Sequence, residues 1–174
     1  MAYRALIGLF LLLSLVGCAD SRNLVRLNQG DTPKLSTADS FYIAVSMDGA
    51  YGDERYEGSG LSLSQIILSS LAKKVRRVEI AKAYQTYDEA LVSAKAKGWK
   101  YLVYPTILQW ENHATEWNGI PDKVEVKIQV IETAPDKLVD AVIINGKSGL
   151  ATFGGDQPQD LLPLPVEEYI SSFF

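Results

Sequence analysis

The feature that most constrains the fold is a run of strict alternation in the second half of the chain. Its apolar members are Val124, Val126, Ile128 and Val130, and its polar members are Glu125, Lys127 and Gln129. Side chains of a strand point alternately to its two faces, so this run predicts a strand with one buried face. The nearly continuous apolar run Trp99–Leu108 predicts a strand covered on both faces, with Pro105 at a bulge or an unpaired position.

Other segments complete an alternating order of strands and helices. Short β-rich runs predict strands at Phe41–Val45, Val78–Ala83 and Leu138–Asn145. Apolar residues at helical spacing predict helices over Leu61–Arg77 and Tyr87–Lys97 and a last helix from Pro165, and Ser62 with Gln65 and Thr86 with Glu89 fit capping boxes. The order βαβαβββα predicts an α+β domain, a mixed sheet of about five strands with helices packed on one side.

The amino-terminal segment is typical of a secretory signal. Arg4 precedes the apolar run Ala5–Val16, which is shorter than the roughly 20 residues that span a bilayer. Leu15-Val16-Gly17-Cys18 resembles the lipobox of bacterial lipoproteins, and Cys18 is the only cysteine. The resemblance implies cleavage before Cys18 and lipidation of its thiol and new amino group by acyl chains such as palmitate. The alternative is an ordinary secretory signal with an incidental cysteine.

The lipobox resemblance also predicts where the chain is held. Ala19 follows the cysteine, whereas an aspartate there is the usual signal for retention in the inner membrane, so we expect an outer-membrane anchor facing the periplasm. The polar stretch that follows is expected to be a flexible tether, with docking of its Leu24, Val25 and Leu27 on the domain as the alternative. The predicted organisation is therefore a signal peptide over residues 1–17, a lipidated tether over 18–40 and one periplasmic domain over 41–174.

Composition excludes several classes of function. Removal of residues 1–17 takes Arg4 with it and leaves 16 basic against 21 acidic residues, a net charge of −5. This balance argues against nucleic-acid binding, which needs a basic face. With Cys18 lipidated, the chain has no thiol for a disulfide, a nucleophile or a metal site.

Two irregular segments contain the residues most suggestive of binding. Ser46–Gly60 has four glycines and four acids, and Trp110–Trp117 combines two tryptophans with the only histidine. Long irregular segments often carry functional residues. The candidate binding residues are Asp48, Tyr56, Ser59, Trp110 and Trp117. The two tryptophans are predicted either as core or cross-strand partners or as exposed contacts for a protein or glycan.

The same two segments contain residues that could serve a catalytic or metal site, but their pattern does not predict one. Glu111, His113 and Glu116 could offer one imidazole and two carboxylates to a metal, but a lone histidine at a hairpin tip favours a solvated turn. Ser59 in Gly-Ser-Gly lacks the nucleophile-elbow pattern, and the acids of Ser46–Gly60 lack the spacing of a calcium loop. We therefore expect no enzyme activity, no metal and no cofactor.

The pattern also resembles known envelope proteins. Tyr101–Ile107, Val124–Glu132 and Leu138-Val139 are similar to the small βαβαβββ domain of the TolB amino-terminal region, the curli-secretion lipoprotein CsgG and the LpoB-type activators of peptidoglycan synthases. The whole chain resembles an uncharacterised family of Gram-negative lipoproteins, a domain of unknown function, through Asp48-Gly49, Tyr56–Gly60 and the tryptophan-rich hairpin. These resemblances bring no catalytic residue.

The expected function follows from the anchor and from the absence of a chemical centre. We expect a non-enzymatic outer-membrane lipoprotein whose periplasmic domain binds another envelope protein. The alternative is a binder of a small ligand or glycan at the acidic loop or the tryptophan hairpin. The sequence leaves the oligomeric state open.

Overall fold

Strands and helices follow one another along the chain in the computed structural model, which describes residues 20–28, 30–113, 120–149 and 157–174. The elements are β1 (Ser21–Arg26), β2 (Ser40–Val45), β3 (Ala50–Tyr51), β4 (Glu54–Arg55), α2 (Ser59–Ala72), β5 (Arg77–Tyr84), α3 (Tyr87–Ala96), β6 (Tyr101–Glu111), β7 (Lys123–Glu132), β8 (Lys137–Lys147), the 3-10 helix η1 (Pro158–Leu161) and α4 (Pro163–Ser171).

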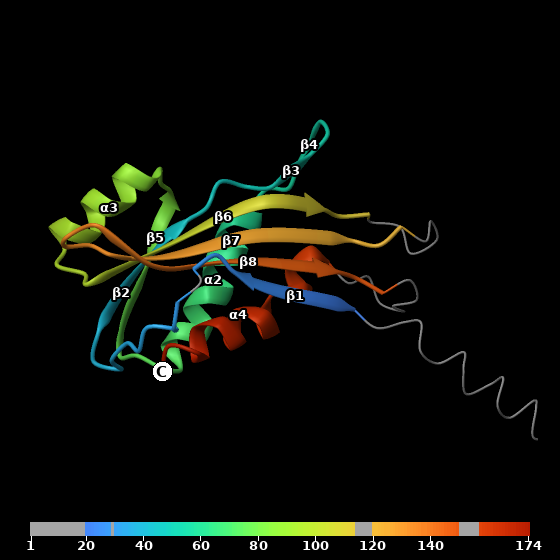
Figure 1. Ribbon diagram of the computed structural model, residues 1–174. Helices are drawn as coiled ribbons and strands as arrows, with labels where there is room; N and C mark the ends of the chain where they lie inside the picture. Colours follow the sequence, from blue (N-terminus) through green and yellow to red (C-terminus); the bar gives the residue numbers. More distant parts are fainter. Residues whose placement is uncertain (1–19, 29, 114–119, 150–156) are drawn as a thin grey trace, which may run out of the picture.

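The main sheet has six strands in the order β1-β8-β7-β6-β2-β5 (Figure 1). β2 pairs in parallel with β5 and β6, and the pairs β6–β7, β7–β8 and β8–β1 are antiparallel. β3 and β4 form a separate small hairpin inside the segment expected to be irregular. The α+β class and the mixed sheet are thus confirmed.

One face of the sheet packs against α2 and α4 and forms the larger core. The alternating residues of β7 contribute Val124, Val126, Ile128 and Val130 to it. Leu71 of α2 and Tyr169 of α4 are almost fully buried there. The alternation in the sequence therefore has the predicted cause, since one face of β7 is covered by helices and its Glu125, Lys127 and Gln129 point to the other face.

α3 covers the opposite face, so the expectation that helices pack on one side is wrong for this helix. Neighbouring residues of β2 divide between the two cores: Phe41 and Ile43 face α2, while Tyr42 and Ala44 face α3. The smaller core under α3 includes Leu91. The cause is that β2 and its neighbours are apolar on both faces, which requires a cover on each side.

β1 is the main departure from the sequence-based boundaries. The sequence leaves open whether Leu24, Val25 and Leu27 stay in a flexible tether or dock on the domain. In the structure Ser21–Arg26 pairs along its whole length with β8, and the Leu27 amide continues the ladder to the Ala141 carbonyl at 2.8 Å. Arg26 forms an ion pair with the buried Asp140. The flexible tether is therefore wrong for this segment and the docked alternative holds, so the folded unit begins about twenty residues before Phe41.

The two predicted capping boxes and the strand around Pro105 differ in how well the sequence predicts them. The capping box at Thr86 is confirmed, since its side chain and that of Glu89 each bond the other's backbone amide. The box at Ser62 is wrong, because α2 begins earlier, after Gly58 in a left-handed conformation with φ of 83°. Pro105 lies opposite Ile128 in the ladder, and the register shift occurs after Ile107 instead.

Several predictions fall on residues that are not described. The signal peptide over residues 1–17, Cys18, Glu116 and Trp117 all lie outside the described residues. Among the helices of the described part, none is long and apolar enough to cross a membrane.

Candidate binding surfaces

The acidic loop Ser46–Gly60 is fastened to the start of α2 by its own polar residues. The Asp48 carboxylate accepts a hydrogen bond from the Gly60 amide at 2.9 Å, and the Ser59 hydroxyl accepts one from the Gly49 amide at 2.9 Å. A side chain at Gly60 would place its Cβ 2.1 Å from the Ser46 carbonyl oxygen. Two of the predicted binding residues, Asp48 and Ser59, therefore hold this loop in place.

Trp110 and Tyr56 support the same loop from beneath and beside it. Trp110 is 2% exposed, and its Cβ lies 2.5 Å from where a Cβ on Gly49 would be. The Tyr56 hydroxyl accepts a hydrogen bond from the Asn112 amide at 3.3 Å. The structure thus brings four of the five predicted residues together, and Trp117 lies outside the described residues. Of the two alternatives for Trp110, the exposed contact is wrong, because the indole is part of the core.

A polar cluster follows at the end of β6. Glu111 is buried and bonds to Gln109, to His113 Nε2 at 3.2 Å and to Lys123 Nζ at 3.1 Å. Burial raises the pKa of the Glu111 carboxyl, but the hydrogen bonds from Lys123, Gln109 and His113 outweigh it and leave the pKa below its usual range. The His113 amide donates to Asp122 at 2.6 Å. The cluster satisfies its own charges and leaves little bonding capacity for a ligand.

This cluster has few of the donors that a metal centre needs. No group of three or more His, Cys, Asp or Glu side chains suitable for a metal ion occurs within the described ranges. Glu111 and His113 do lie together, as the period of the strand predicts. Glu116, the third ligand considered from the sequence, is in 114–119 and outside those ranges.

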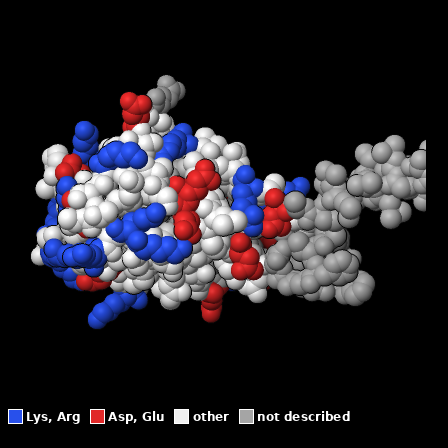
Figure 2. Space-filling view, turned by 90° about the horizontal axis from the view of Figure 1, so that it is seen from below, with Lys and Arg blue, Asp and Glu red and all other residues white. Residues whose placement is uncertain are grey.

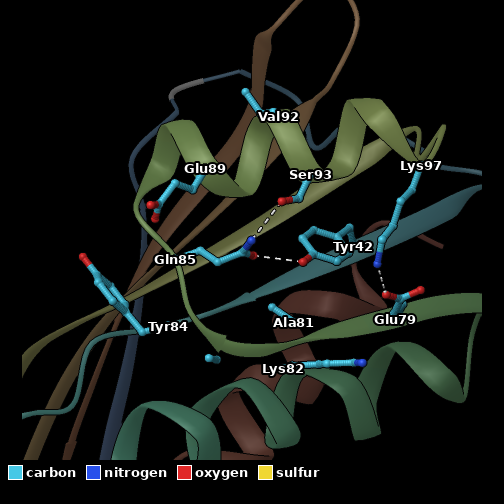
Figure 3. A pocket seen from close by; sticks show the side chains of 11 residues that line it. Tyr42, Glu79, Ala81, Lys82, Tyr84, Gln85, Glu89, Val92, Ser93 and Lys97 are labelled. Atoms are coloured by element: carbon cyan, nitrogen blue, oxygen red, sulfur yellow. Dashed lines mark hydrogen bonds and ion pairs between the residues drawn. The ribbon is translucent and has the colours of Figure 1, made fainter.

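A larger open surface lies between α3 and the edge strand β5. It is a groove of about 710 Å³, and Figure 3 shows the side chains that line it. Across its wall, the Tyr42 hydroxyl donates to Gln85 Oε1 at 2.9 Å, and Gln85 Nε2 donates to the Ser93 hydroxyl at 2.9 Å. At one end Lys97 and Glu79 form an ion pair of 2.6 Å (Figure 3). The groove therefore has fixed polar walls.

Two features make this groove suited to a partner. Tyr84 and Val92 line it and are exposed, Val92 by 66%. β5 pairs only with β2, so the other edge of the strand carries no partner strand among the described residues. Free backbone groups beside exposed apolar side chains are the components of a strand-addition site. No local pattern in the sequence indicates this groove, because the crossover from β5 through α3 to β6 creates it.

A smaller groove of about 230 Å³ lies at the other end of the sheet. Polar side chains dominate its lining, which includes Asn23, Gln109, Lys123, Asn145 and Lys147. It combines β1, β6, β7 and β8, and the sequence could not have shown it without the pairing of β1.

Charges do not single out a further site. Figure 2 shows most Lys and Arg side chains gathered toward one end of the face in view, with acidic side chains among and beside them. Some of the protein's exposed charges are paired, as Lys73 is with Glu167 at 2.8 Å and Lys100 with Asp39 at 2.9 Å.

Comparison with protein families places the chain among domains without an assigned role. A family model described as a domain of unknown function (DUF4823) matches residues 33–173. The chain belongs to this family. The matched stretch begins after β1, which pairs with β8 inside it. No protein with a curated description matches the chain.

Solved structures share the fold at low sequence identity. PelC from Paraburkholderia phytofirmans, described as a dodecamer, is 15% identical with a TM-score of 0.65, over 88% of this chain and 96% of that one. The lipoprotein GNA1162 from Neisseria meningitidis is 12% identical with a TM-score of 0.48, over 76% and 96%. TolB from Acinetobacter baumannii is 15% identical with a TM-score of 0.40, over 74% and 27%. Only the first likeness is strong enough to support the fold.

Proposed function

We propose that this DUF4823 protein is a lipid-anchored protein of the outer membrane whose periplasmic domain acts by binding another envelope protein, without catalysis. The anchor rests on Leu15-Val16-Gly17-Cys18 and on Ala19 after it. β1 begins at Ser21, three residues after Cys18, so the domain is expected to sit close to the membrane surface.

The observation that carries the binding role is the groove beside α3 together with the edge of β5, which has no partner strand in the described part of the chain. An extended segment of a partner can pair with the β5 backbone, while its side chains enter pockets beside the strand. The exposed Tyr84 and Val92 offer apolar contact, and the Tyr42–Gln85–Ser93 chain keeps the groove wall in place. PelC, which shares this fold, is described as a dodecamer, so a domain of this fold can support protein–protein contacts.

The anchor is tested by replacing the cysteine. Cys18→Ser should abolish the incorporation of a labelled fatty acid and release the folded domain from the membrane fraction. The domain should keep its circular dichroism spectrum, because residue 18 precedes β1. Label that persists in the variant would contradict lipidation at this position.

The binding role is tested with a photo-crosslinking residue in the lipidated, full-length protein. Placed at position 92, it should give defined crosslinked species in the native envelope. Leu164 on α4 is the matched control, since it is 65% exposed against 66% for Val92 but lies on the opposite side of the sheet. Equal or absent crosslinking at the two positions would contradict a binding site in the groove.

A small polar ligand or glycan is the second candidate, and the polar groove favours it. The side-chain amides of Asn23 and Asn145, which lie opposite each other on β1 and β8, offer both donors and acceptors. Titration with soluble peptidoglycan fragments should shift the side-chain amide resonances of these residues in an NMR spectrum. Shifts confined to other residues, or none, would leave only the protein-binding role.

A further inference from the structure

Among the described residues the sheet has two edges without a partner strand, and the features of these edges are complementary. β1 forms one edge and β5 the other, and within the described residues neither has a second partner strand. We infer that the partner at the β5–α3 groove is a second copy of this chain, whose β1 adds to β5. This inference rests on the proposed function and names the partner of the same groove.

Strand directions make this contact a favourable one. From β1 to β5 the sheet contains three antiparallel and two parallel pairings, so β1 and β5 run in opposite directions. In Figure 1 the chain enters β1 at one end of the sheet, and the strand leads away from that end. Copies anchored in one membrane share this orientation, so β1 of one copy meets β5 of the next in the antiparallel sense, the more stable pairing.

The faces of the two strands also match. Leu24 of β1 packs on the α2–α4 side, so Val25 and Leu27 point to the side that carries α3. Both are exposed, Val25 by 44%. If β1 continues the sheet of the next copy, these two side chains lie against Val92 in the groove. The exposed apolar side chains at the two edges would thus bury one another.

The contact is heterologous, because two different surfaces meet. Each copy then keeps one free edge, and the assembly grows until it closes into a ring or ends as an open arc. A strand pair of about six residues is a small interface, so association should be weak in solution. A shared membrane raises the effective concentration and strengthens it.

The test uses the lipidated chain in its native membrane, and the introduced cysteines are the only free thiols of this chain because its one native cysteine, Cys18, is lipidated. Val25→Cys together with Val92→Cys should give a ladder of crosslinked species with a short bismaleimide. Each single variant should stay monomeric, because the contact joins two different positions. Within one chain the two edges are about five strand spacings, or roughly 24 Å, apart, which keeps a short linker from closing internally.

A matched control and three outcomes decide the result. Val25→Cys with Leu164→Cys should give no ladder, although Leu164 is as exposed as Val92. A ladder with the control pair, or a dimer with Val25→Cys alone, would overturn the proposed contact. Absence of a ladder with Val25→Cys and Val92→Cys would also overturn it. If the photo-crosslinking residue at position 92 then captured a different protein, the binding role would stand without self-assembly.

Discussion

The loop Ser46–Gly60 and the adjoining end of β6 with Trp110 and Glu111 form one region, called the corner. The corner differs from the groove beside α3 in how its polar and apolar groups are satisfied. In the corner, Asp48, Ser59 and Glu111 all bond to groups of the same chain, and Trp110 is buried. In the groove, Val92 is exposed, and the neighbouring strand edge pairs with nothing in the described part of the chain. The corner is the more conspicuous region in the sequence, yet the groove has the unused capacity.

This difference teaches where binding is to be sought in such a domain. Acids, glycines and tryptophans attract attention because they are typical of functional loops, but they serve equally well to hold a loop on its own fold. A surface that binds a partner must keep bonding groups or apolar area unused in the free protein. Substitutions in the corner should therefore change stability, and those in the groove should change association.

The largest expected effect is on stability, from Gly60→Ala in the corner. The added Cβ would meet the Ser46 carbonyl oxygen at 2.1 Å and its carbon at 2.9 Å, and these backbone atoms cannot rotate away. We expect the free energy of unfolding to fall by about 3 kcal/mol. Urea denaturation followed by circular dichroism measures it as a lower midpoint at unchanged slope.

The control for this substitution is Gly30→Ala. No atom lies within 4 Å of the place that a Cβ on Gly30 would take, and Gly30 is exposed. Its free energy of unfolding should change by no more than about 0.5 kcal/mol. Equal effects of the two substitutions would mean that the corner is looser than its contacts indicate.

An intermediate effect is expected from Glu111→Gln in the polar cluster. The glutamine keeps an acceptor but removes the charge that pairs with Lys123 and His113, so the variant should lose about 1–2 kcal/mol at pH 7. The pKa of Glu111 is lowered in the folded protein. Its contribution is therefore fully present above the carboxyl pKa of the unfolded chain, and is lost as the pH falls through the lowered pKa.

Urea midpoints of both proteins between pH 7 and pH 3 check this dependence. The gap between them should narrow in acid, whereas a gap that widens there would give the wrong sign. Glu125→Gln is the control, because this carboxylate takes part in none of the ion pairs found among the described residues. Its midpoint should differ little from that of the parent at any pH.

Much of the fold could be predicted because its signals are local. The alternation in Val124–Val130 and the capping box at Thr86 depend on residues within a few positions of each other, and both are confirmed. The sequence indicates that this segment could dock but predicts no strand at β1, because only Leu24 and Val25 in it are apolar. Its support comes from β8 and from Asp140, which is 114 residues away from Arg26 in the sequence.

The candidate site was predicted in part for the same reason. Asp48, Tyr56 and Ser59 were identified as a group, since glycines and acids concentrate there in the sequence. Their roles were not predictable, because the atoms they bond are fixed only when the loop folds against α2 and β6. The groove depends on which strand ends up at the edge of the sheet, and no single stretch of sequence specifies that order.

The smallest expected effect on stability, and the sharpest on association, comes from Val92→Lys. Val92 is exposed, lysine favours a helix more than valine does, and Asp88 lies one turn earlier on α3 as an opposite charge. The free energy of unfolding should therefore change by less than about 0.5 kcal/mol.

In the groove, however, the ammonium of the introduced lysine would replace the apolar contact with Val25 of the incoming β1 and would lose part of its hydration there. Energy transfer between labelled, lipidated copies in vesicles should then require about tenfold higher surface density, which corresponds to about 1.4 kcal/mol. Leu164→Lys, equally exposed on α4, should leave the transfer unchanged. A loss of transfer in both variants would indicate a general charge effect, and a loss in neither would place the contact between copies away from the groove.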